Sequence, residues 1–363
     1  MSDITAPGPQ FALESAWLPQ ELASDADRAI CRSLIEGGSK TFSAASLLLP
    51  AKIREPAFAL YAFCRLSDDL VDVDGGSLDA IDRLRYRLDL AYAGRPIDSG
   101  VDRAFADVVA RFDMPRALPE ALIDGLEWDV GGVRCEELSD LYDYAARVAG
   151  AVGAMMSVIM GVRDPVAIAR ACDLGVAMQL TNVARDVGED ARNGRIYLPL
   201  SWLRAEGIDP DRWLADPAFN PMIGAVVARL LATADMLYSR SDSGIAALPA
   251  LCRPGIFAAR HLYSEIGVEV ARRGCDSVSG RARVSGLQKL SLMGRVLADA
   301  VTVGRGADIS PALRETAYLV DAVANQQGWG PRRRATDRPS FTERFLWAAE
   351  LLAGLDSRNG TSR

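Results

Sequence analysis

The chain has 363 residues, of which 49% are hydrophobic and 25% are charged, and its formal net charge is −7 with an isoelectric point of about 5.0. This composition is typical of a globular protein, and the length allows one large domain or two small ones. A nucleic-acid-binding protein usually presents a basic face, so the acidic balance disfavours that class. His261 is the only histidine, which excludes metal sites built from several histidines.

Cysteine usage and the start of the chain point to the cytoplasm. The six cysteines form no C-x-x-C pair, so we expect reduced thiols. Residues 1–19 carry no basic residue and no apolar core of the signal-peptide kind. The longest apolar run, Ala151–Val162, is shorter than the roughly 20 residues that span a bilayer. We therefore expect a cytoplasmic protein that touches a membrane only at its surface.

Hydrophobic periodicity predicts helices almost throughout the chain, and alternating β-type runs are absent. Helix starts are marked where an acidic residue precedes a proline, at Asp164-Pro165 and at Glu55-Pro56. Glycines mark helix ends at positions 94, 161 and 274. We expect helices over residues 24–36, 39–49, 55–73, 77–93, 101–112, 116–131, 138–161, 165–190, 220–247, 253–274, 285–303 and 309–325.

These helices predict an all-α chain with a single domain over residues 21–325. The preceding segment, residues 1–20, bears Pro and Gly and is expected to be flexible. Residues 191–222, with four prolines, form the one extended irregular stretch. The tail over 326–363 is polar and Arg-rich up to Arg338 and then carries an apolar patch, Phe345–Leu355. That patch favours a docked terminal helix over a membrane anchor.

Two helical stretches carry a polar stripe through apolar surroundings. In the first, the polar residues recur at spacings of 4, 3 and 4 and are Tyr61, Arg65, Asp68 and Asp72. In the second, they recur at spacings of 3, 4 and 4 and are Gln179, Asn182, Asp186 and Asp190. Residues four apart share a helix face, with Cβ atoms about 6 Å apart. A helix that is apolar nearly all round is usually buried, so each stripe predicts a wet or metal-filled cavity opposite it.

The carboxylates on the stripes indicate magnesium chemistry. Buried carboxylates are costly unless they pair with cations or bind a metal. Mg²⁺ binds one or two carboxylates together with water and phosphate oxygens, so facing aspartate pairs fit a small magnesium cluster that holds a diphosphate. Arg65, Arg185 and Lys40 are candidate cations for the same anion, and apolar walls would shelter a hydrocarbon chain and a carbocation from water.

A solvated or ion-paired helix face is the simpler interpretation of a single aspartate pair. Two pairs in one chain, each with a further acid beside it and an apolar helical stretch before it, favour the catalytic interpretation. The further acids, Asp69 and Glu189, are expected to face solvent or to support the motif residues.

The chain resembles the squalene/phytoene synthase family, closest to its bacterial phytoene synthases. The resemblance runs from about Gly38 to Val284. Besides the two stripes, it is carried by Ser39-Lys40-Thr41-Phe42, by Tyr144 with Val148-Ala149-Gly150-Ala151-Val152-Gly153, and by Gly194-Arg195-Ile196-Tyr197-Leu198-Pro199.

This resemblance implies an isoprenoid synthase fold, all-α around a central cavity, and a head-to-head condensation of two allylic diphosphates. Loss of the first diphosphate gives an allylic cation. The double bond of the second molecule captures this cation to form a cyclopropylcarbinyl (prephytoene) diphosphate. A second ionisation, rearrangement and proton loss yield a triene hydrocarbon. With geranylgeranyl diphosphate the product is phytoene, the first step of carotenoid biosynthesis.

The resemblance also implies the roles of individual residues. The implied magnesium ligands are Asp68, Asp72, Asp186 and Asp190, with Asn182 and Gln179 lining the metal site. The residues implied to bind diphosphate are Arg65, Lys40, Arg185 and Tyr263. Tyr144 would face the reacting carbons, Tyr61 would contact substrate, and Ser39 and Phe42 would lie on the helix that closes over the site.

Cavity depth should select between C15 and C20 substrates, because both use the same ionisation chemistry. Ser46 lies one turn after Phe42, and a small residue there leaves room for a longer chain. This favours geranylgeranyl diphosphate and a C40 product. Gly153 and Gly175 are similarly small, although small residues also serve plain helix packing.

Cofactors and partners follow from the same resemblance. Mg²⁺ is the expected ion, with Mn²⁺ as the alternative. No NADPH is expected, because neither a dinucleotide fingerprint nor the C-terminal anchor of eukaryotic squalene synthases is visible. The product is a water-insoluble hydrocarbon, so we expect peripheral membrane association, with contact to other carotenoid-pathway enzymes left open and no nucleic acid partner.

Three alternatives stay open. A C15-specific synthase would make presqualene diphosphate or dehydrosqualene. A non-catalytic assembly factor for respiratory complex I would keep the fold and lose the motif aspartates, all of which are present here. A terpene cyclase or a head-to-tail chain-elongating synthase fits Asp68-Asp69-Leu70-Val71-Asp72 alone, and does not fit the second stripe.

Two positions depart from the family pattern. Relatives usually carry an aromatic residue where Cys275 stands and an Arg pair where Gly280-Arg281 stands. No diphosphate contact is therefore assigned at the C-terminal end of the domain. His261 is interpreted as a structural helix residue.

Overall fold

The computed structural model describes residues 21–73, 77–285 and 308–326, with six single residues between 286 and 307, and without the side chains of Asp72 and Val73. Every regular element in these ranges is helical, as the periodicity predicted. The elements are α1 (Asp25–Gly38), α2 (Lys40–Ser46), α3 (Ala51–Val73), α4 (Leu78–Tyr92), α5 (Gly100–Phe112), α6 (Ala117–Val130), α7 (Leu138–Ala145), a π-helical turn (Ala146–Gly150), α8 (Ala151–Ile159), α9 (Pro165–Arg192), α10 (Leu200–Ala205), α11 (Pro210–Ala215), α12 (Pro221–Ala247), α13 (Arg253–Arg272), a 3₁₀ turn (Arg314–Thr316) and α15 (Ala317–Ala324).

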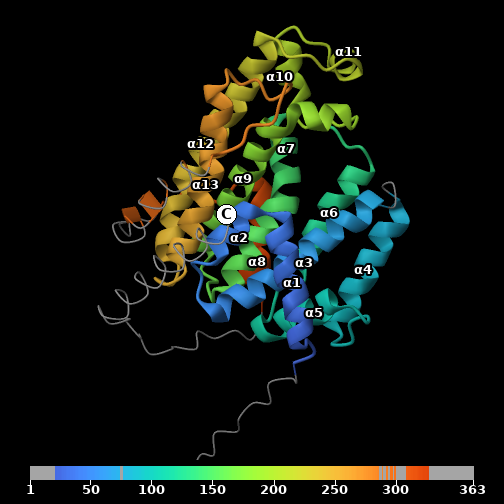
Figure 1. Cartoon of the computed structure of the whole chain (residues 1–363), viewed down its shortest axis with the longest axis vertical. Coiled ribbons are helices and arrows are strands. Elements are labelled where there is room, and N and C mark those ends of the chain that lie inside the picture. Colours follow the sequence, from blue (N-terminus) through green and yellow to red (C-terminus); the bar gives the residue numbers. More distant parts are fainter. Residues whose placement is uncertain are drawn as a thin grey trace, which may run out of the picture.

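Helix α9 is the centre of the bundle. It begins behind the N-cap Asp164, whose side chain accepts a hydrogen bond from Ala167 N at 3.0 Å, as the Asp-Pro signal predicted. Helices α7, α8, α12, α13 and α15 all pack against it. In Figure 1, α12 and α13 lie on the left, α4 and α6 on the right, and α9 between them. The prediction of a central, buried helix is therefore confirmed.

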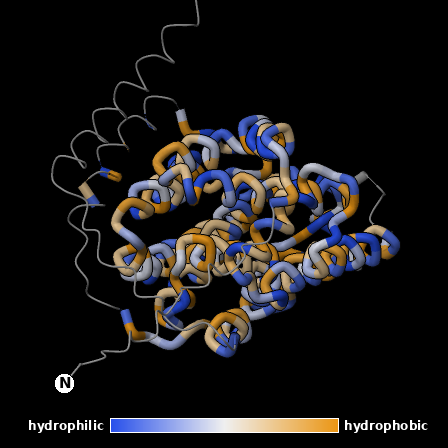
Figure 2. Tube along the Cα trace, turned by 90° about the horizontal axis from the view of Figure 1, so that it is seen from below, coloured by the Kyte–Doolittle hydropathy of each residue, from blue (hydrophilic) through white to orange (hydrophobic). Residues whose placement is uncertain are grey.

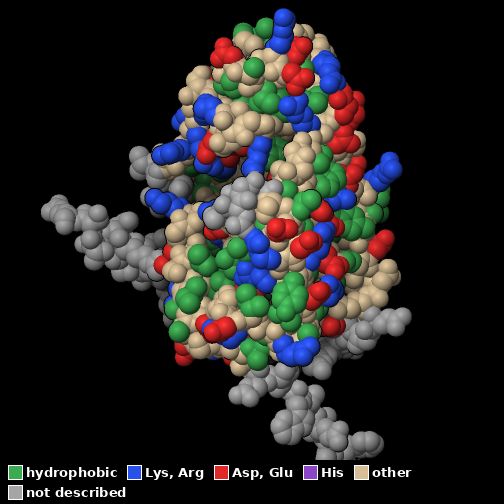
Figure 3. All heavy atoms as spheres, turned by 90° about the vertical axis from the view of Figure 1, so that its right-hand side faces the viewer, with side chains coloured by type: hydrophobic (Ala, Val, Ile, Leu, Met, Phe, Trp, Pro, Cys, Tyr) green, Lys and Arg blue, Asp and Glu red, His purple; other side chains and the backbone are tan. Residues whose placement is uncertain are grey.

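Two buried apolar clusters build the core. One joins α9 to α12, α13 and the short helices α10 and α11, and the other joins α1, α3, α4, α5, α6 and α8. Hydrophobic (orange) and hydrophilic (blue) positions alternate along most of the tube in Figure 2, as in amphipathic helices with one face in a core. The face in Figure 3 intersperses acidic and basic side chains. Ion pairs such as Arg85 with Asp124 and Glu127 account for this pattern between α4 and α6.

The start of α3 differs from the prediction. The helix begins at Ala51, so Pro56 lies inside it rather than opening it. The first turn forms on Pro50, whose carbonyl accepts hydrogen bonds from Ile53 N and Arg54 N, both at 2.9 Å. Beyond the first turn, a proline removes one hydrogen bond and its ring crowds the carbonyl four residues before it, a cost of about 3 kcal/mol that the burial of the long helix α3 offsets.

Other boundaries also differ. The stretch 191–222, predicted irregular, contains α10 and α11, and the prolines at 199 and 210 open these helices instead of breaking them. The predicted helix 138–161 is interrupted by the π-helical turn. Residues 308–313 lack helical structure, so the helix predicted over 309–325 is confined to α15 and the 3₁₀ turn before it. Most of the predicted helix 285–303 lies outside the described residues.

Helices α8 and α9 approach each other backbone to backbone, and glycine makes this approach feasible. A Cβ on Gly175 would lie 2.3 Å from Ala149 O, and a Cβ on Gly153 would lie 2.3 Å from Ala171 O. Ala149 belongs to the π-helical turn, a widened turn that often marks a functional site. These small residues therefore serve helix packing.

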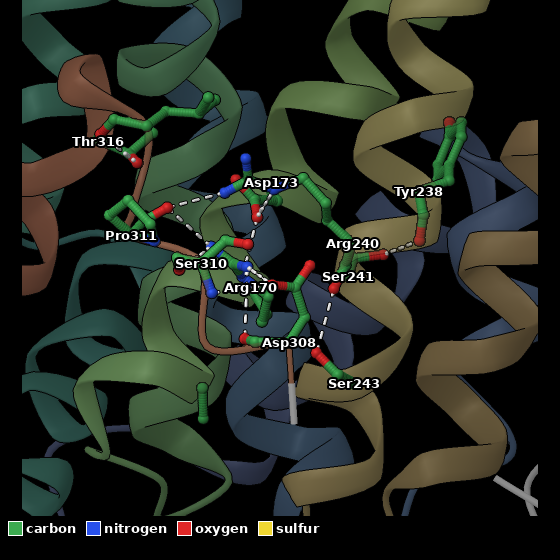
Figure 4. A network of polar contacts seen from close by, with 12 residues as sticks. Arg170, Asp173, Tyr238, Arg240, Ser241, Ser243, Asp308, Ser310, Pro311 and Thr316 are labelled. Carbon is green, nitrogen blue, oxygen red and sulfur yellow. Dashed lines mark hydrogen bonds and ion pairs between the residues drawn. The ribbon is translucent and has the colours of Figure 1, made fainter. Parts of the chain in front are cut away.

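A buried ion-pair network closes the end of α9 that lies away from the aspartates (Figure 4). Arg170 and Asp173 have fully buried side chains, with Arg170 Nε 2.9 Å from Asp173 Oδ2. Arg240 of α12 donates to the same oxygen at 3.1 Å. Arg170 also donates to Ser310 O at 3.1 Å and Pro311 O at 3.2 Å. Because buried charges need partners, the network ties residues 308–311 across α9 and α12.

The domain boundaries predicted at residues 21 and 325 border the described part of the chain. Residues 1–20 and 327–363, including the apolar patch Phe345–Leu355, lie outside the described residues, so the limits at 21 and 325 stay predictions. Within the described part, α12 is the one helix long and apolar enough to cross a membrane. Half of its apolar window is buried against the rest of the bundle, as in a core helix.

Gly175→Ala is expected to destabilise the fold, because the new Cβ would overlap the Ala149 carbonyl, a backbone atom that cannot swing away. Overpacking of this kind costs about 1–3 kcal/mol. Thermal unfolding of the full chain measures the loss. Gly37→Ala, whose Cβ would meet nothing within 4 Å, is the matched control and should be neutral or slightly stabilising. Equal melting temperatures for the two variants would contradict the close approach.

Candidate active site

The two polar stripes meet at one polar cavity of about 240 Å³. From α9 it is lined by Gln179, Asn182, Asp186 and Asp190. From α3 it is lined by Arg65 and Asp68. The helical spacing therefore places the second stripe and two residues of the first around one space, while Tyr61 lines a neighbouring cavity. The side chain of Asp72 lies outside the described part of the chain.

A longer apolar cavity of about 340 Å³ adjoins the polar one. The residues that line both cavities are Arg65, Asp68, Gln179 and Asn182. Along α9 the lining runs from Asn182 back to Ala167, a distance of about 22 Å at the helical rise per residue. Gly153 and Gly175 are also part of its wall, so these glycines serve both helix packing and the cavity. The arrangement suits a molecule with one anionic end and a long hydrocarbon chain.

Aromatic residues form the wall of the apolar cavity near α2. The ring centroid of Phe42 lies 6.3 Å from that of Tyr61 and 5.1 Å from that of Tyr263. All three line the cavity together with the buried Ser46. The Ser46 hydroxyl donates to Ser43 O at 2.7 Å, so the hydroxyl is satisfied within its own helix. A small, satisfied side chain leaves that part of the cavity open.

Ser39 and Lys40 are not among the residues that line either cavity. Ser39 is the N-cap of α2, and its Oγ accepts a hydrogen bond from Phe42 N at 3.2 Å. Lys40 is exposed at the first position of that helix. The geometry therefore brings Phe42 to the cavity and leaves Ser39 and Lys40 at the start of α2, away from both cavities.

Two arginines hold Asp186. Arg185 bonds to both carboxylate oxygens, at 2.7 Å and 2.5 Å. Arg281, from the segment after α13, places its Nε 2.9 Å from Oδ1 and its Nη2 3.1 Å from Oδ2. Arg281 also lies 3.4 Å from Glu189. Arg281, at a position where the chain departs from the family pattern, thus brings a positive charge to the second stripe. The sequence did not predict this contact, because a single arginine after Gly280 carries no motif.

A backbone contact at Gly188 holds that segment in place. Gly188 N donates to Ser277 O at 3.1 Å, and a Cβ at this position would lie 2.2 Å from Val278 O. The glycine between Asp186 and Asp190 therefore lets residues 276–281 lie directly on α9. On the other stripe, Arg65 pairs with Asp69, with Nη2 2.7 Å from Oδ1.

The donor set fits a hard divalent cation. Asn182 Oδ1 is buried and has no hydrogen-bond partner, while its Nδ2 donates to Gln179 Oε1 at 3.3 Å. Burial, together with the charges of Asp186 and Glu189, raises the pKa of Asp190 to about 7. Both features mark oxygen atoms that a cation would stabilise. Among the described residues no three Asp, Glu, Cys or His side chains gather tightly enough to hold a metal alone. Mg²⁺ needs only one or two carboxylates when water and phosphate oxygens complete its shell.

A second set of polar side chains lines the same cavity, and the sequence did not predict that its members would meet. Asp129 accepts a hydrogen bond from Tyr144 Oη at 3.0 Å and another from Tyr197 Oη at 2.6 Å. Arg195 lines the cavity as well. Tyr197 and Arg195 belong to the motif Gly194–Pro199, which had no assigned role. Asp129 gave no signal, since a lone acid near the end of an amphipathic helix looks like a solvated residue.

His261 lies buried in α13, with Nε2 2.7 Å from Asp299 Oδ2. Burial lowers the pKa of its imidazole. It lines neither cavity, so the geometry fits the structural role expected for it.

Comparison with known proteins gives one consistent result. The family model for squalene/phytoene synthase matches residues 35–288. The phytoene synthase of Cereibacter sphaeroides is 52% identical over 317 residues, covering 84% of this chain and 89% of that protein. The phytoene synthase of Rhodobacter capsulatus is 50% identical over 313 residues, covering 84% and 92%. A crystal structure of a dehydrosqualene synthase in complex with a ligand matches with a TM-score of 0.68 at 30% identity, covering 75% of this chain and 96% of that one.

The matched region contains both stripes and the π-helical turn, which contribute to the walls of the two cavities, and Arg281, which pairs with Asp186. The helical architecture agrees with that of the solved relatives. The chain belongs to the squalene/phytoene synthase family.

Proposed function

We propose that the protein is a prenyltransferase that condenses two geranylgeranyl diphosphates head to head to phytoene, with release of two diphosphates. The observation that carries this proposal is the junction of the two cavities, where Arg65, Asp68, Gln179 and Asn182 line both. A diphosphate in the polar cavity has its prenyl chain in the apolar one. The name phytoene synthase, borne by relatives at 50% and 52% identity, supports the C20 substrate.

Cationic side chains bind the diphosphate in this proposal. Arg65 lines the polar cavity from α3, whereas Arg185 and Arg281 line neither cavity and reach it through Asp186, with which both pair. Planar guanidinium groups match phosphate oxygens bidentately. They orient the leaving group and offset its charge as the carbon–oxygen bond breaks.

Magnesium would be held by Asp68, Asp186, Asp190 and Asn182, with Asp72 on the same stripe as Asp68, and Mn²⁺ would suit the same oxygen ligands. The ion supplies Lewis-acid neutralisation of the departing diphosphate. The protein itself excludes water, because the walls of the long cavity are mostly apolar. The cation then meets the double bond of the second substrate rather than water. Tyr144 lines the polar cavity, and in this proposal it faces the reacting carbons.

The proposal also covers where the protein acts and where its product goes. Phytoene carries no polar group, so it must pass from the apolar cavity to another apolar phase. We expect peripheral association of a cytoplasmic protein with a membrane surface and transfer of product to a later enzyme of the carotenoid pathway.

A product assay tests the proposed reaction. Purified full-length protein with Mg²⁺ and without NADPH should convert geranylgeranyl diphosphate to a C40 triene, identified by chromatography and mass. Farnesyl diphosphate is offered separately and in competition. A C30 hydrocarbon or presqualene diphosphate would assign the protein to the C15 branch. Absence of turnover and of magnesium-dependent pyrophosphate binding would favour a non-catalytic assembly role.

Ser46→Phe should shift the preference from the C20 toward the C15 substrate, because a bulky ring at this buried position shortens the apolar cavity. The expected change in the C15-to-C20 ratio of kcat/KM is about tenfold or more, the scale of one or two methylene groups. Ala44→Phe adds the same ring at an exposed position of α2 and is the matched control. An unchanged ratio in Ser46→Phe would refute the role of this position in chain length.

Gly188→Ala should weaken diphosphate binding, because its Cβ would push residues 276–281 away from α9 and carry Arg281 out of reach. Loss of one charged hydrogen-bonding partner is worth about 1.5–3 kcal/mol, or roughly tenfold or more in affinity. Calorimetric titration with inorganic pyrophosphate and Mg²⁺ measures this. Gly280→Ala, in the same segment with nothing near its Cβ, serves as control. Wild-type affinity in Gly188→Ala would show that the contact does not position Arg281.

A further inference from the structure

One charged side chain lines the apolar cavity far from the junction with the polar one. Among the described residues that line the apolar cavity, the charged ones are Arg65 and Asp68, at the junction, and Arg170. Arg170 lies about 18 Å along α9 from Asn182 at the helical rise per residue, close to the far end of the lining at Ala167. A charge is costly beside hydrocarbon, so this position needs a structural reason.

Oxygen atoms behind the cavity wall hold the Arg170 guanidinium, as Figure 4 shows. Its Nε lies 2.9 Å from Asp173 Oδ2, and its Nη1 lies 3.2 Å from Asp308 Oδ1. Its Nη2 donates to Ser310 O at 3.1 Å and to Pro311 O at 3.2 Å. None of these four partners lines the apolar cavity. All three nitrogens therefore face oxygen, and the charge is directed away from the cavity.

Helix α12 packs directly on the methylene stem of Arg170. A Cβ on Gly244 would lie 2.2 Å from Arg170 Cβ and 3.1 Å from its Cγ, so only glycine permits this approach. Gly244 and Ser241 line the cavity together with Arg170. Ser241 Oγ donates to Tyr238 O at 2.7 Å and is thus satisfied within α12. Because the guanidinium is held on the other side, the part of Arg170 that faces the cavity is its stem.

The distance along α9 matches the length of a C20 prenyl chain. An extended chain advances about 1.2 Å per bond, as in an extended polypeptide. The roughly 16 main-chain bonds of a C20 group therefore reach about 19 Å, and the roughly 12 bonds of a C15 group reach about 14 Å. A C25 group, with roughly 20 bonds, would reach about 24 Å and pass Arg170. The stem lies where the end of a C20 chain would arrive.

We propose that Arg170 is a specificity-determining residue that sets the upper limit of prenyl-chain length at C20. Its stem borders the far end of the cavity, and its charge anchors the stem to Asp173 and to residues 308–311. Turning the side chain aside would leave buried donors unpaired, which is costly. Residues 308–311 lie beyond residues 35–288, so this wall depends on a segment outside the family match. The proposal rests on the proposed function and adds an upper limit to the room that Ser46 leaves.

Two substitutions at Arg170 separate the size of the side chain from its charge. Arg170→Ala and Arg170→Met both remove the guanidinium and leave Asp173 paired with Arg240 alone, so both lose the same ion pairs. Only alanine also removes the stem, and it vacates slightly more heavy atoms than one isoprene unit contains. Arg170→Ala should therefore admit a C25 chain, whereas Arg170→Met should keep the C20 limit.

Product mass gives the readout. Each full-length protein receives Mg²⁺ with equal amounts of geranylgeranyl diphosphate (C20) and geranylfarnesyl diphosphate (C25), and the condensed products are separated by chromatography. Wild type and Arg170→Met should form products from C20 chains only. In Arg170→Ala the C25-to-C20 ratio of kcat/KM should rise about tenfold or more, the scale of discrimination between homologous chains in an apolar pocket. The ratio is taken within one preparation, so a loss of folded protein cancels.

Gly244→Ala keeps the proposal testable if neither Arg170 variant folds. The new Cβ overlaps the Arg170 stem and should press it into the cavity, which lowers the C20-to-C15 ratio of kcat/KM. Gly224→Ala lies on the same helix, and its Cβ would meet nothing nearer than 3.4 Å. Gly224 does not line either cavity, so this matched control should leave the ratio unchanged.

Several results would overturn the proposal. One is acceptance of the C25 chain by the wild type, and another is an unchanged C25-to-C20 ratio in Arg170→Ala. Equal gains in Arg170→Ala and Arg170→Met would also overturn it, because loss of the ion pairs rather than of the stem would then relax the limit. An unchanged C20-to-C15 ratio in Gly244→Ala would show that the stem does not border the chain. Failure of the wild type to condense geranylgeranyl diphosphate would instead reject the proposed function.

Discussion

The arrangement of the site depends on how the negative charges of carboxylates on a buried helix are stabilised. Helix α9 is packed on most sides by apolar side chains, yet it carries Asp186 and Asp190 on one face. Desolvation makes such charges costly unless cations, hydrogen bonds or water stabilise them. Asp186 is held by Arg185 and Arg281, whereas burial and neighbouring acids raise the pKa of Asp190. These acids therefore line a polar cavity instead of packing into the apolar core, and α3 forms the opposite wall of that cavity.

The same helix makes the apolar cavity feasible. Backbone contact at Gly153 and Gly175 brings α8 close to α9, while the widened π-helical turn redirects the chain between Tyr144 and the cavity-lining Val148. At the far end of α9, Arg170 and its partners tie residues 308–311 across the bundle. One end of the long cavity is thus bordered by a buried network with its charges matched, and the other end opens to the acids of the stripes. Chemistry is confined to that second end.

Helical spacing was enough to predict the parts of the site that lie on single helices. The stripe from Gln179 to Asp190 is a property of one helix, so local periodicity places all four side chains on one face. Groups assembled from distant segments were not predictable in this way. Asp129 meets Tyr197 across 68 residues and Arg281 meets Asp186 across 95. Pro56 failed as a start signal because tertiary burial of α3 outweighs one missing hydrogen bond.

Charge balance explains why the acids and arginines are paired with each other in this protein. In the proposed function, a diphosphate would compete with Asp186 for the guanidinium groups of Arg185 and Arg281, and a divalent cation would compete with those arginines for the carboxylate. Such an exchange of partners would keep the charge of Asp186 compensated before and after substrate binds. Asp129, in the same cavity, accepts hydrogen bonds from the phenols of Tyr144 and Tyr197. The acids of this cavity are therefore stabilised both by guanidinium groups, on Asp186, and by phenol donors, on Asp129.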